Sequence, residues 1–128
     1  LYIAEGDLRF FASYGFGAPD EPAASQTLPP FNTLGPRIEW RMSNESGAWR
    51  PFATIVRYLL DKTDDYGGGE VLVVTRLGEG TTCHIAYVDA RANSDANALA
   101  QEAADEQAKD FDCADEPVFV GNFEAWER

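Results

Sequence analysis

Hydrophobic and polar residues alternate along several stretches of this chain, which is the pattern of strands with one buried face. The strongest is Val71 to Leu77, a nearly continuous run of β-branched and aliphatic residues that predicts a strand covered on both faces. Gly78-Glu79-Gly80 follows, and Thr81 to Asp89 is a second run of strand-forming residues. Since a short glycine-containing connection between two such runs is typical of a β-hairpin, we expect one at the centre of the fold.

The pattern changes to a helical period after Ala92. Alanines and Leu99 recur at spacings of three and four, and acidic residues occupy most of the positions between them. This predicts a helix over residues 94–110, with Ser94 as its N-cap. The apolar stripe is almost entirely alanine, so we expect the helix to lie close to the sheet and to bury little area per residue.

Four other stretches predict strands: Leu8 to Phe16, Arg37 to Met42, Trp49 to Leu60 and Val118 to Phe123. Residues 17–36 are rich in proline and predict a long loop draped over the core. A chain of 128 residues can build one core, so we expect a single domain over residues 1–128. The expected fold is α+β, an antiparallel sheet of about six strands with one helix packed on one face.

The chain is strongly acidic, with 22 acidic residues, 10 basic residues and a net charge of −12. Nucleic acids and anionic membrane surfaces are poor partners for such a chain, whereas a basic protein is a better one. Acidity that simply keeps an exported protein in solution is the plainer interpretation. No apolar run approaches the length needed to cross a bilayer, so we expect no transmembrane segment.

Cys83 and Cys113 are the only cysteines in the sequence. We expect a disulfide between them, which would close a loop of about 30 residues and hold the helix against the hairpin. Two reduced and partly buried thiols are the alternative, as in a protein of the cytosol. A disulfide would favour an oxidising compartment, either the periplasm or the outside of the cell.

His84 is the only histidine, so any catalytic histidine must be this residue. We expect Cys83, Ile85 and Tyr87 on one face of their strand and His84 on the other, which excludes a nucleophile–base pair between Cys83 and His84. A lone histidine in a strand is usually structural. We therefore expect no catalytic residue and no cofactor.

An acidic loop before the hairpin is a weak candidate for calcium, with oxygen ligands from Asp61, Asp64, Asp65 and Glu70. The EF-hand pattern fails there, because Tyr66 stands where the turn glycine belongs. A solvated loop is the better interpretation, and we expect no metal site.

Two groups of side chains are candidates for contact with a partner. Charged residues on the strand face opposite Trp40 and on the acidic side of the helix form the predicted binding surface: Arg37, Arg41, Asp105 and Glu106. The three tryptophans, Trp40, Trp49 and Trp126, could instead form a sugar-binding platform, although core packing accounts for most of them.

One segment resembles a known group of proteins. It reads Thr81-Thr82-Cys83-His84-Ile85-Ala86-Tyr87-Val88-Asp89-Ala90, followed by Asn93, Asn97-Ala98-Leu99-Ala100 and Ala104-Asp105. This segment is similar to uncharacterised small exported proteins of alphaproteobacteria, and the similarity extends from Val71 to Cys113, about one third of the chain. The resemblance implies export and pairing of the two cysteines, and it implies no activity.

No motif in the sequence specifies a reaction. The leading hypothesis is an exported, non-enzymatic binding protein, an inhibitor or accessory factor for a partner with a basic surface. A small hydrolase that uses His84 with a carboxylate is one alternative, and a structural component of the cell envelope is another. A cleft that brings His84 within hydrogen-bond reach of Ser, Asp or Glu would favour the hydrolase.

Overall fold

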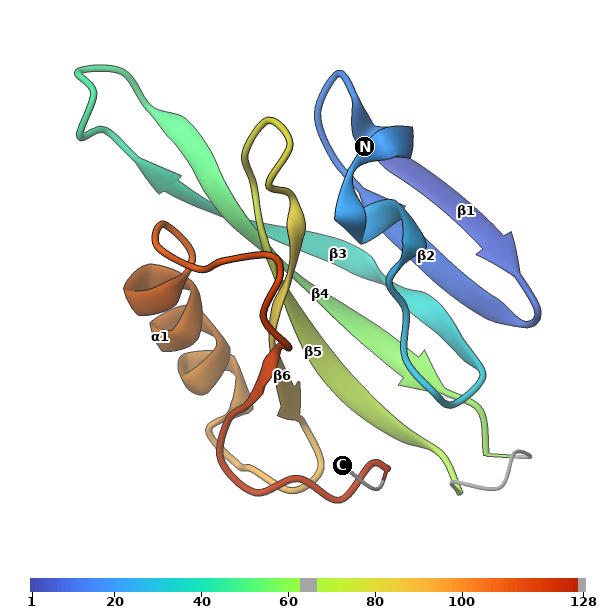
Figure 1. The fold of residues 1–128 in the computed structure, drawn as a ribbon. Coiled ribbons are helices and arrows are strands. Elements are labelled where there is room, and N and C mark those ends of the chain that lie inside the picture. Colours follow the sequence, from blue (N-terminus) through green and yellow to red (C-terminus); the bar gives the residue numbers. More distant parts are fainter. Residues whose placement is uncertain (63–66, 127–128) are drawn as a thin grey trace.

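A computed structural model describes residues 1–62 and 67–126 and has an α+β fold (Figure 1). The elements are β1 (Tyr2–Gly6), β2 (Arg9–Ser13), β3 (Asn32–Ser43), β4 (Arg50–Leu60), β5 (Gly69–Arg76), β6 (Cys83–Asp89), α1 (Ala96–Gln107) and β7 (Val118–Phe119). Two short 3-10 helices, η1 (Ala18–Asp20) and η2 (Pro22–Ser25), lie between β2 and β3. Among the helices of the described residues, none has the length and hydropathy needed to cross a membrane.

The main sheet has five strands in the order β3-β4-β5-β6-β7. The first four strands pair antiparallel, whereas β7 runs parallel to β6 because the chain crosses over through α1 before it returns. β1 and β2 form a separate two-stranded hairpin. The expected α+β fold class is therefore confirmed, with three differences: the strands form two sheets and not one, the main sheet is mixed, and its last strand is shorter than the predicted run 118–123.

α1 packs its small side chains against one face of the main sheet, as the alanine pattern predicts. Its buried residues are all alanine: Ala96, Ala100, Ala103 and Ala104. They contact a layer of strand residues that includes Ile55, Leu72 and Val74. The helix is shorter than the predicted 94–110 and begins after Asp95, not Ser94, without a side-chain cap hydrogen bond. Without that cap, the start of the helix depends on its packing.

The expected disulfide between Cys83 and Cys113 is present, with the two Cα atoms 5.8 Å apart. Cys83 is the first residue of β6 and is fully buried, and Cys113 follows α1. The bond ties the segment after the helix to the sheet. It therefore supplies the additional anchoring that a helix with an alanine stripe needs.

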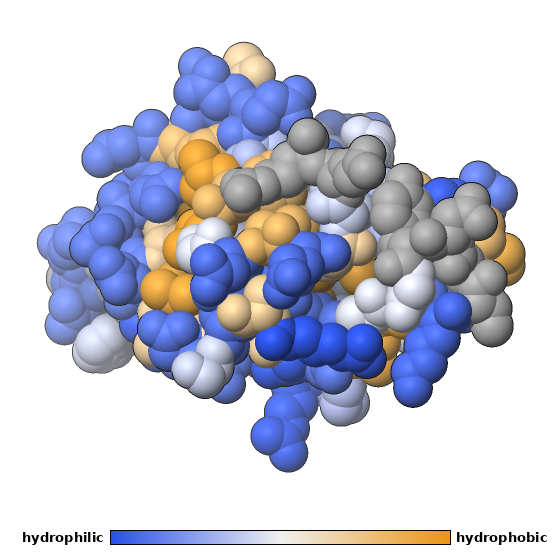
Figure 2. Space-filling view, turned by 90° about the horizontal axis from the view of Figure 1, so that it is seen from below, coloured by the Kyte–Doolittle hydropathy of each residue, from blue (hydrophilic) through white to orange (hydrophobic). Residues whose placement is uncertain are grey.

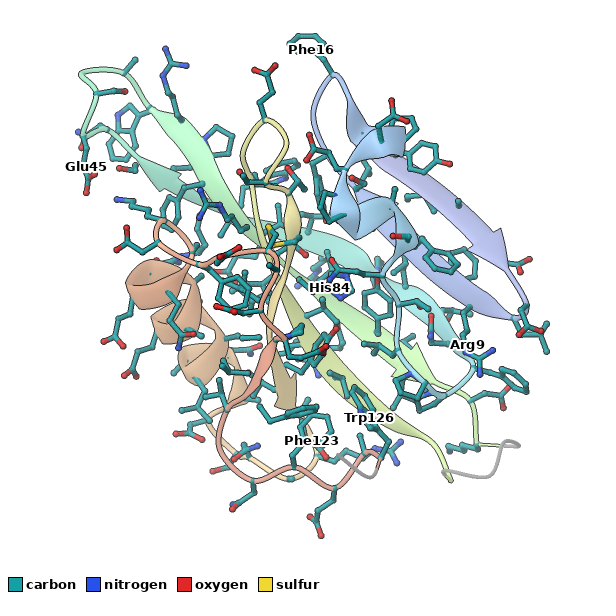
Figure 3. All side chains as sticks on the ribbon, viewed as in Figure 1. Arg9, Phe16, Glu45, His84, Phe123 and Trp126 are labelled. Atoms are coloured by element: carbon teal, nitrogen blue, oxygen red, sulfur yellow. A yellow bond between two sulfur atoms is a disulfide. The ribbon has the colours of Figure 1, made fainter. Side chains whose placement is uncertain are left out.

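The opposite face of the sheet is covered by the loop before β3 and by the C-terminal segment. Leu28 from the loop and Trp126 from the C-terminal segment are buried against strand residues such as Tyr58 and Val73. Trp126 also meets Phe123 edge to face, with ring centroids 4.7 Å apart, and Figure 3 shows both residues close together in the lower part of the view. The view from below shows apolar residues reaching the surface at this end among hydrophilic ones (Figure 2).

A β-bulge in β6 changes which residues share a face. Val74 pairs with Ala86 and Thr75 pairs with His84, so Ile85 is the extra residue. Tyr87 therefore lies on the same side as His84, in the cluster opposite the helix, and Ala86 lies on the helix side. The expected grouping of Cys83, Ile85 and Tyr87 on one face is wrong for Tyr87, because strict alternation does not continue through a bulge.

Residues 17–36 are not one long loop, because β3 already begins at Asn32. The preceding segment runs beside the free edge of β6: the Ala23 amide donates to the Thr82 carbonyl at 2.9 Å, and the His84 amide donates to Gln26 Oε1 at 2.8 Å. These bonds satisfy backbone groups at the start of β6 and just before it, which β7 does not reach. The proline-rich segment is thus part of the framework of the sheet.

Candidate functional site

Three aromatic residues, Tyr14, Phe16 and Trp40, line a cleft near the N-terminal hairpin. Tyr14 follows β2 directly and is buried, while Trp40 on β3 is 44% exposed. Their rings meet edge to face with centroids 5.6 Å apart. Burial raises the pKa of Tyr14, so its phenol stays neutral. This pair gives the cleft a rigid aromatic floor.

The cleft has a volume of about 470 Å³ and is bounded by segments that are distant in the sequence. Phe16 lies on one side, and Pro51 and Leu77 come from β4 and from the connection between β5 and β6. Phe16 is fully exposed, and Figure 3 shows its ring pointing away from the body of the protein. This aromatic ring is wholly solvated beside an apolar cleft. Covering it with a partner would remove apolar surface from water and so favour binding.

The turn at residues 78–82 forms one wall of the cleft and is held in place by the buried carboxylate of Glu21. Glu21 Oε1 accepts a hydrogen bond from the Thr82 amide at 3.0 Å, and Glu21 Oε2 accepts one from the Gly80 amide at 2.8 Å. The Thr82 hydroxyl also accepts from the Gly78 amide at 3.1 Å. The wall is therefore formed before any partner arrives, which lowers the entropy lost on binding.

His84 lies inside the protein, between the sheet and the N-terminal segments (Figure 3). It is 1% exposed, and its Nδ1 atom is 2.8 Å from the Tyr87 hydroxyl. Burial lowers the pKa of His84 to about 3, so the ring is neutral at ordinary pH. Its Nε2 atom has no hydrogen-bond partner among the described residues. This geometry gives no support to a hydrolase, because the ring is closed to a substrate and no carboxylate of residues 1–62 and 67–126 orients it.

The predicted binding surface is partly occupied by contacts within the protein. Arg41 forms a bidentate pair with Asp105 on α1, with nitrogen–oxygen distances of 3.1 and 2.7 Å. The hydrogen bond to Asp105 raises the pKa of Arg41. Arg37 is exposed on β3 and Glu106 is exposed on α1. Two of the four predicted residues thus fix the helix to the sheet, and the other two face solvent.

The acidic loop can be described only in part. Asp64 and Asp65 lie outside the described residues. Glu70 is engaged with Arg57, whose Nη1 atom is 3.2 Å from Glu70 Oε1. Among the described residues, no group of three or more His, Cys, Asp or Glu side chains could hold a metal ion.

The three tryptophans do not form one platform. Trp126 is buried with Phe119, Phe123 and Tyr87, so core packing accounts for it. Trp40 lines the cleft, while Trp49 is 68% exposed and is not among the cleft residues. The signal for the cleft was present in the sequence as Tyr14-Gly15-Phe16-Gly17, where a strand ends in an aromatic residue followed by another between two glycines.

Comparison with known proteins gives no relative: no family model, no curated protein and no solved structure matches this chain.

Proposed function

We propose that this protein is an exported, non-enzymatic binding protein for a basic partner protein, and that the cleft beside Phe16 and Trp40 is its contact site. The single observation that carries the proposal is the full exposure of Phe16 at the rim of a preformed cleft with an aromatic floor. Phenylalanine, tyrosine and tryptophan are enriched at the centres of protein interfaces, where they contribute much of the binding free energy.

The charge of the protein supports a basic partner. Glu79 lines the cleft and is exposed, and Asp20 is exposed in the N-terminal segment. On α1 and the segment after it, residues 96–116 contain seven acids and one base, Lys109. Lys109 Nζ is 2.6 Å from Glu45 Oε1, so this lysine is already paired. The acidic residues of this segment therefore produce a negative potential. It would attract a cationic surface within about one Debye length.

Export is the part of the proposal that rests on the disulfide. Stable disulfides are typical of the periplasm and the outside of the cell, where no reducing pool removes them. In the Cys83–Cys113 bond, Cys83 is fully buried and Cys113 is partly buried against the core. The resemblance to exported alphaproteobacterial proteins agrees with this location and is likewise part of the proposal.

The test is a capture experiment with purified protein as bait and the exported proteins of the source organism as prey. The wild type is compared with Trp40→Ala and with Trp49→Ala, an exposed tryptophan outside the cleft. We expect one basic protein to be retained at low salt and weakened at high salt. Trp40→Ala should lower the affinity for the purified partner at least roughly tenfold, and Trp49→Ala should not.

Two outcomes would count against the proposal. Retention of a partner by Trp40→Ala and the wild type alike would show that the cleft is not the contact site. Retention of no protein at any salt concentration would remove the support for a binding role and favour a structural role in the envelope.

A further inference from the structure

The outer edge of β3 is open beside the cleft. β3 is the first strand of the five-stranded sheet and, among the strands that the structure describes, pairs only with β4. In the described residues, no backbone hydrogen bond outside the strands involves residues 37–43. Figure 1 shows the far half of β3 leading with β4 into a hairpin that extends beyond the other strands. An unpaired strand edge of this kind is a template for another extended segment.

The first half of β3 is closed to such pairing. The Asn32 amide donates to the Leu8 carbonyl at 3.1 Å, so the N-terminal hairpin already occupies that end. The register between β3 and β4 then shifts between Leu34 and Ile38. Gly35 allows this close approach, because a Cβ atom there would lie 2.9 Å from the Arg57 carbonyl oxygen, and Pro36 has no amide to donate. Only the stretch from Ile38 onward is available.

The backbone of Trp40 points to the open side. The Asp61 amide donates to the Phe31 carbonyl, so the backbone of Asp61 faces the β3 side. β4 pairs with β5 without a register shift from Ala53 to Leu60, and regular alternation back from Asp61 therefore turns the backbone groups of Ala53 toward β3. Arg41 is the partner of Ala53 and faces β4, and the N–H and C=O of Trp40 therefore face away from the sheet.

The side chains of residues 38–42 are held by α1 on one face of the sheet and are exposed and apolar on the other. On the helix side, Arg41 is bound to Asp105, and Glu39 accepts a hydrogen bond from Gln101 at 3.0 Å. On the cleft side, Trp40 and Met42 are each 44% exposed. A segment added at this edge would therefore place alternate side chains next to Trp40 and the cleft.

We infer that the partner of this protein binds as an extended basic segment that pairs with β3 at residues 38–42 and places an apolar side chain in the cleft. This inference rests on the proposed function and names the mode of binding at the same site. A second copy of the chain is a poor occupant, because each copy carries a net charge of −12 and the two would repel. A cationic segment is attracted by the same charge.

The test uses random peptides displayed on phage, selected against the folded protein, followed by amide hydrogen exchange measured by NMR. We expect the selected peptides to carry Lys or Arg around an apolar residue. On binding, exchange of the Trp40 amide should slow at least roughly tenfold, while the Glu39 and Arg41 amides, already bonded to β4, should not change. A version of the peptide with N-methyl groups at alternate positions should bind at least roughly tenfold more weakly than one methylated at the intervening positions.

Several results would overturn the inference. If selected peptides bind and Trp40→Ala weakens them, but exchange of the Trp40 amide is unchanged, the partner docks on the face of the sheet and not on its edge; the proposed function then survives. If the Trp40 amide is protected in the free protein and light scattering shows a dimer, a second copy is the occupant. If no peptide binds and no exported partner is captured, the proposed function itself fails.

Discussion

The Nδ1 atom of His84 and the hydroxyl oxygen of Tyr87 lie 2.8 Å apart inside the protein, although the two residues are three apart on one strand. Regular alternation would place them on opposite faces. The extra residue Ile85 shifts the register so that both rings face the same cluster, where they meet edge to face with centroids 5.6 Å apart. The bulge thus gives the only histidine a buried hydrogen-bond partner.

This burial predicts a specific dependence of stability on pH. Burial lowers the pKa of His84 to about 3, whereas in the unfolded chain it is about 6.5. Well above pH 6.5, His84 is neutral in the folded and the unfolded state alike. It then contributes nothing to the pH dependence of the free energy of unfolding. Below that value the unfolded state binds a proton that the folded state does not bind. The free energy of unfolding should therefore fall as the pH falls, by up to about 1.4 kcal/mol per pH unit.

The measurement is urea unfolding at several pH values between about 5 and 7, a window above the usual pKa range of carboxylates. The matched variant is His84→Gln, which keeps a polar side chain but does not titrate. Its free energy of unfolding should be nearly flat across the window. Parallel curves for the variant and the wild type would show that His84 is not the source of the slope.

The disulfide should account for a large part of the stability. Replacing Cys83 and Cys113 together with alanine removes a bond that closes a loop with a sequence separation of 30. On the chain-entropy model this lowers the free energy of unfolding by about 3–4 kcal/mol. Urea unfolding of the double variant, beside wild type with and without a reductant, measures the loss. A loss below about 1 kcal/mol would mean that packing of α1 holds the segment without the bond.

The most predictable features of this fold are those that depend on local pattern. The period of the β5–β6 hairpin, the alanine stripe of α1 and the presence of only two cysteines each indicate the observed structure directly. No comparable pattern in the sequence indicates the bulge at Ile85, because the bulge depends on which residue of β5 pairs with each residue of β6. Likewise, the two-residue strand β7 is fixed by the return of the chain beside β6 and not by its own sequence.

The candidate site was harder to predict than the fold. Arg41 and Asp105 are in the predicted binding surface on account of their charge, yet they bind each other across the sheet and helix. Phe16 and Trp40 come together only through the tertiary arrangement of the N-terminal segment over β3. Charge and exposure can be expected from a sequence, but ion pairs and ring contacts between side chains that are distant in the sequence cannot.

The Arg41–Asp105 pair should give a small but measurable coupling. The side chains are 28% and 46% exposed, so solvent screens the interaction, while the bidentate geometry strengthens it. A double-mutant cycle with Arg41→Ala and Asp105→Ala should give a coupling of about 0.5–1 kcal/mol at low salt. Arg41→Ala with Glu106→Ala, an exposed neighbour on the same helix, is the control and should be additive. Equal coupling in the two cycles would mean that the effect is general electrostatics and not this contact.

Two glycines with nearly the same positive φ should respond differently to alanine. Gly80 has φ of 74° and Gly121 has φ of 75°, and at both positions a side chain is strained. At Gly80 an added Cβ meets no atom within 4 Å. At Gly121 it would lie 2.6 Å from Asn93 Oδ1, which accepts a hydrogen bond from the Asn122 amide at 3.0 Å.

Gly80→Ala should therefore lower the free energy of unfolding by about 1–2 kcal/mol, the cost of the left-handed conformation alone. Gly121→Ala should cost at least about 1 kcal/mol more, because it also displaces Asn93 and breaks its bond to the C-terminal segment. Urea unfolding of the two variants measures the difference, and hydrogen exchange of the Asn122 amide should rise only in Gly121→Ala. Equal losses of stability with unchanged exchange at Asn122 would show that the Asn93 contact does not hold the C-terminal segment in place.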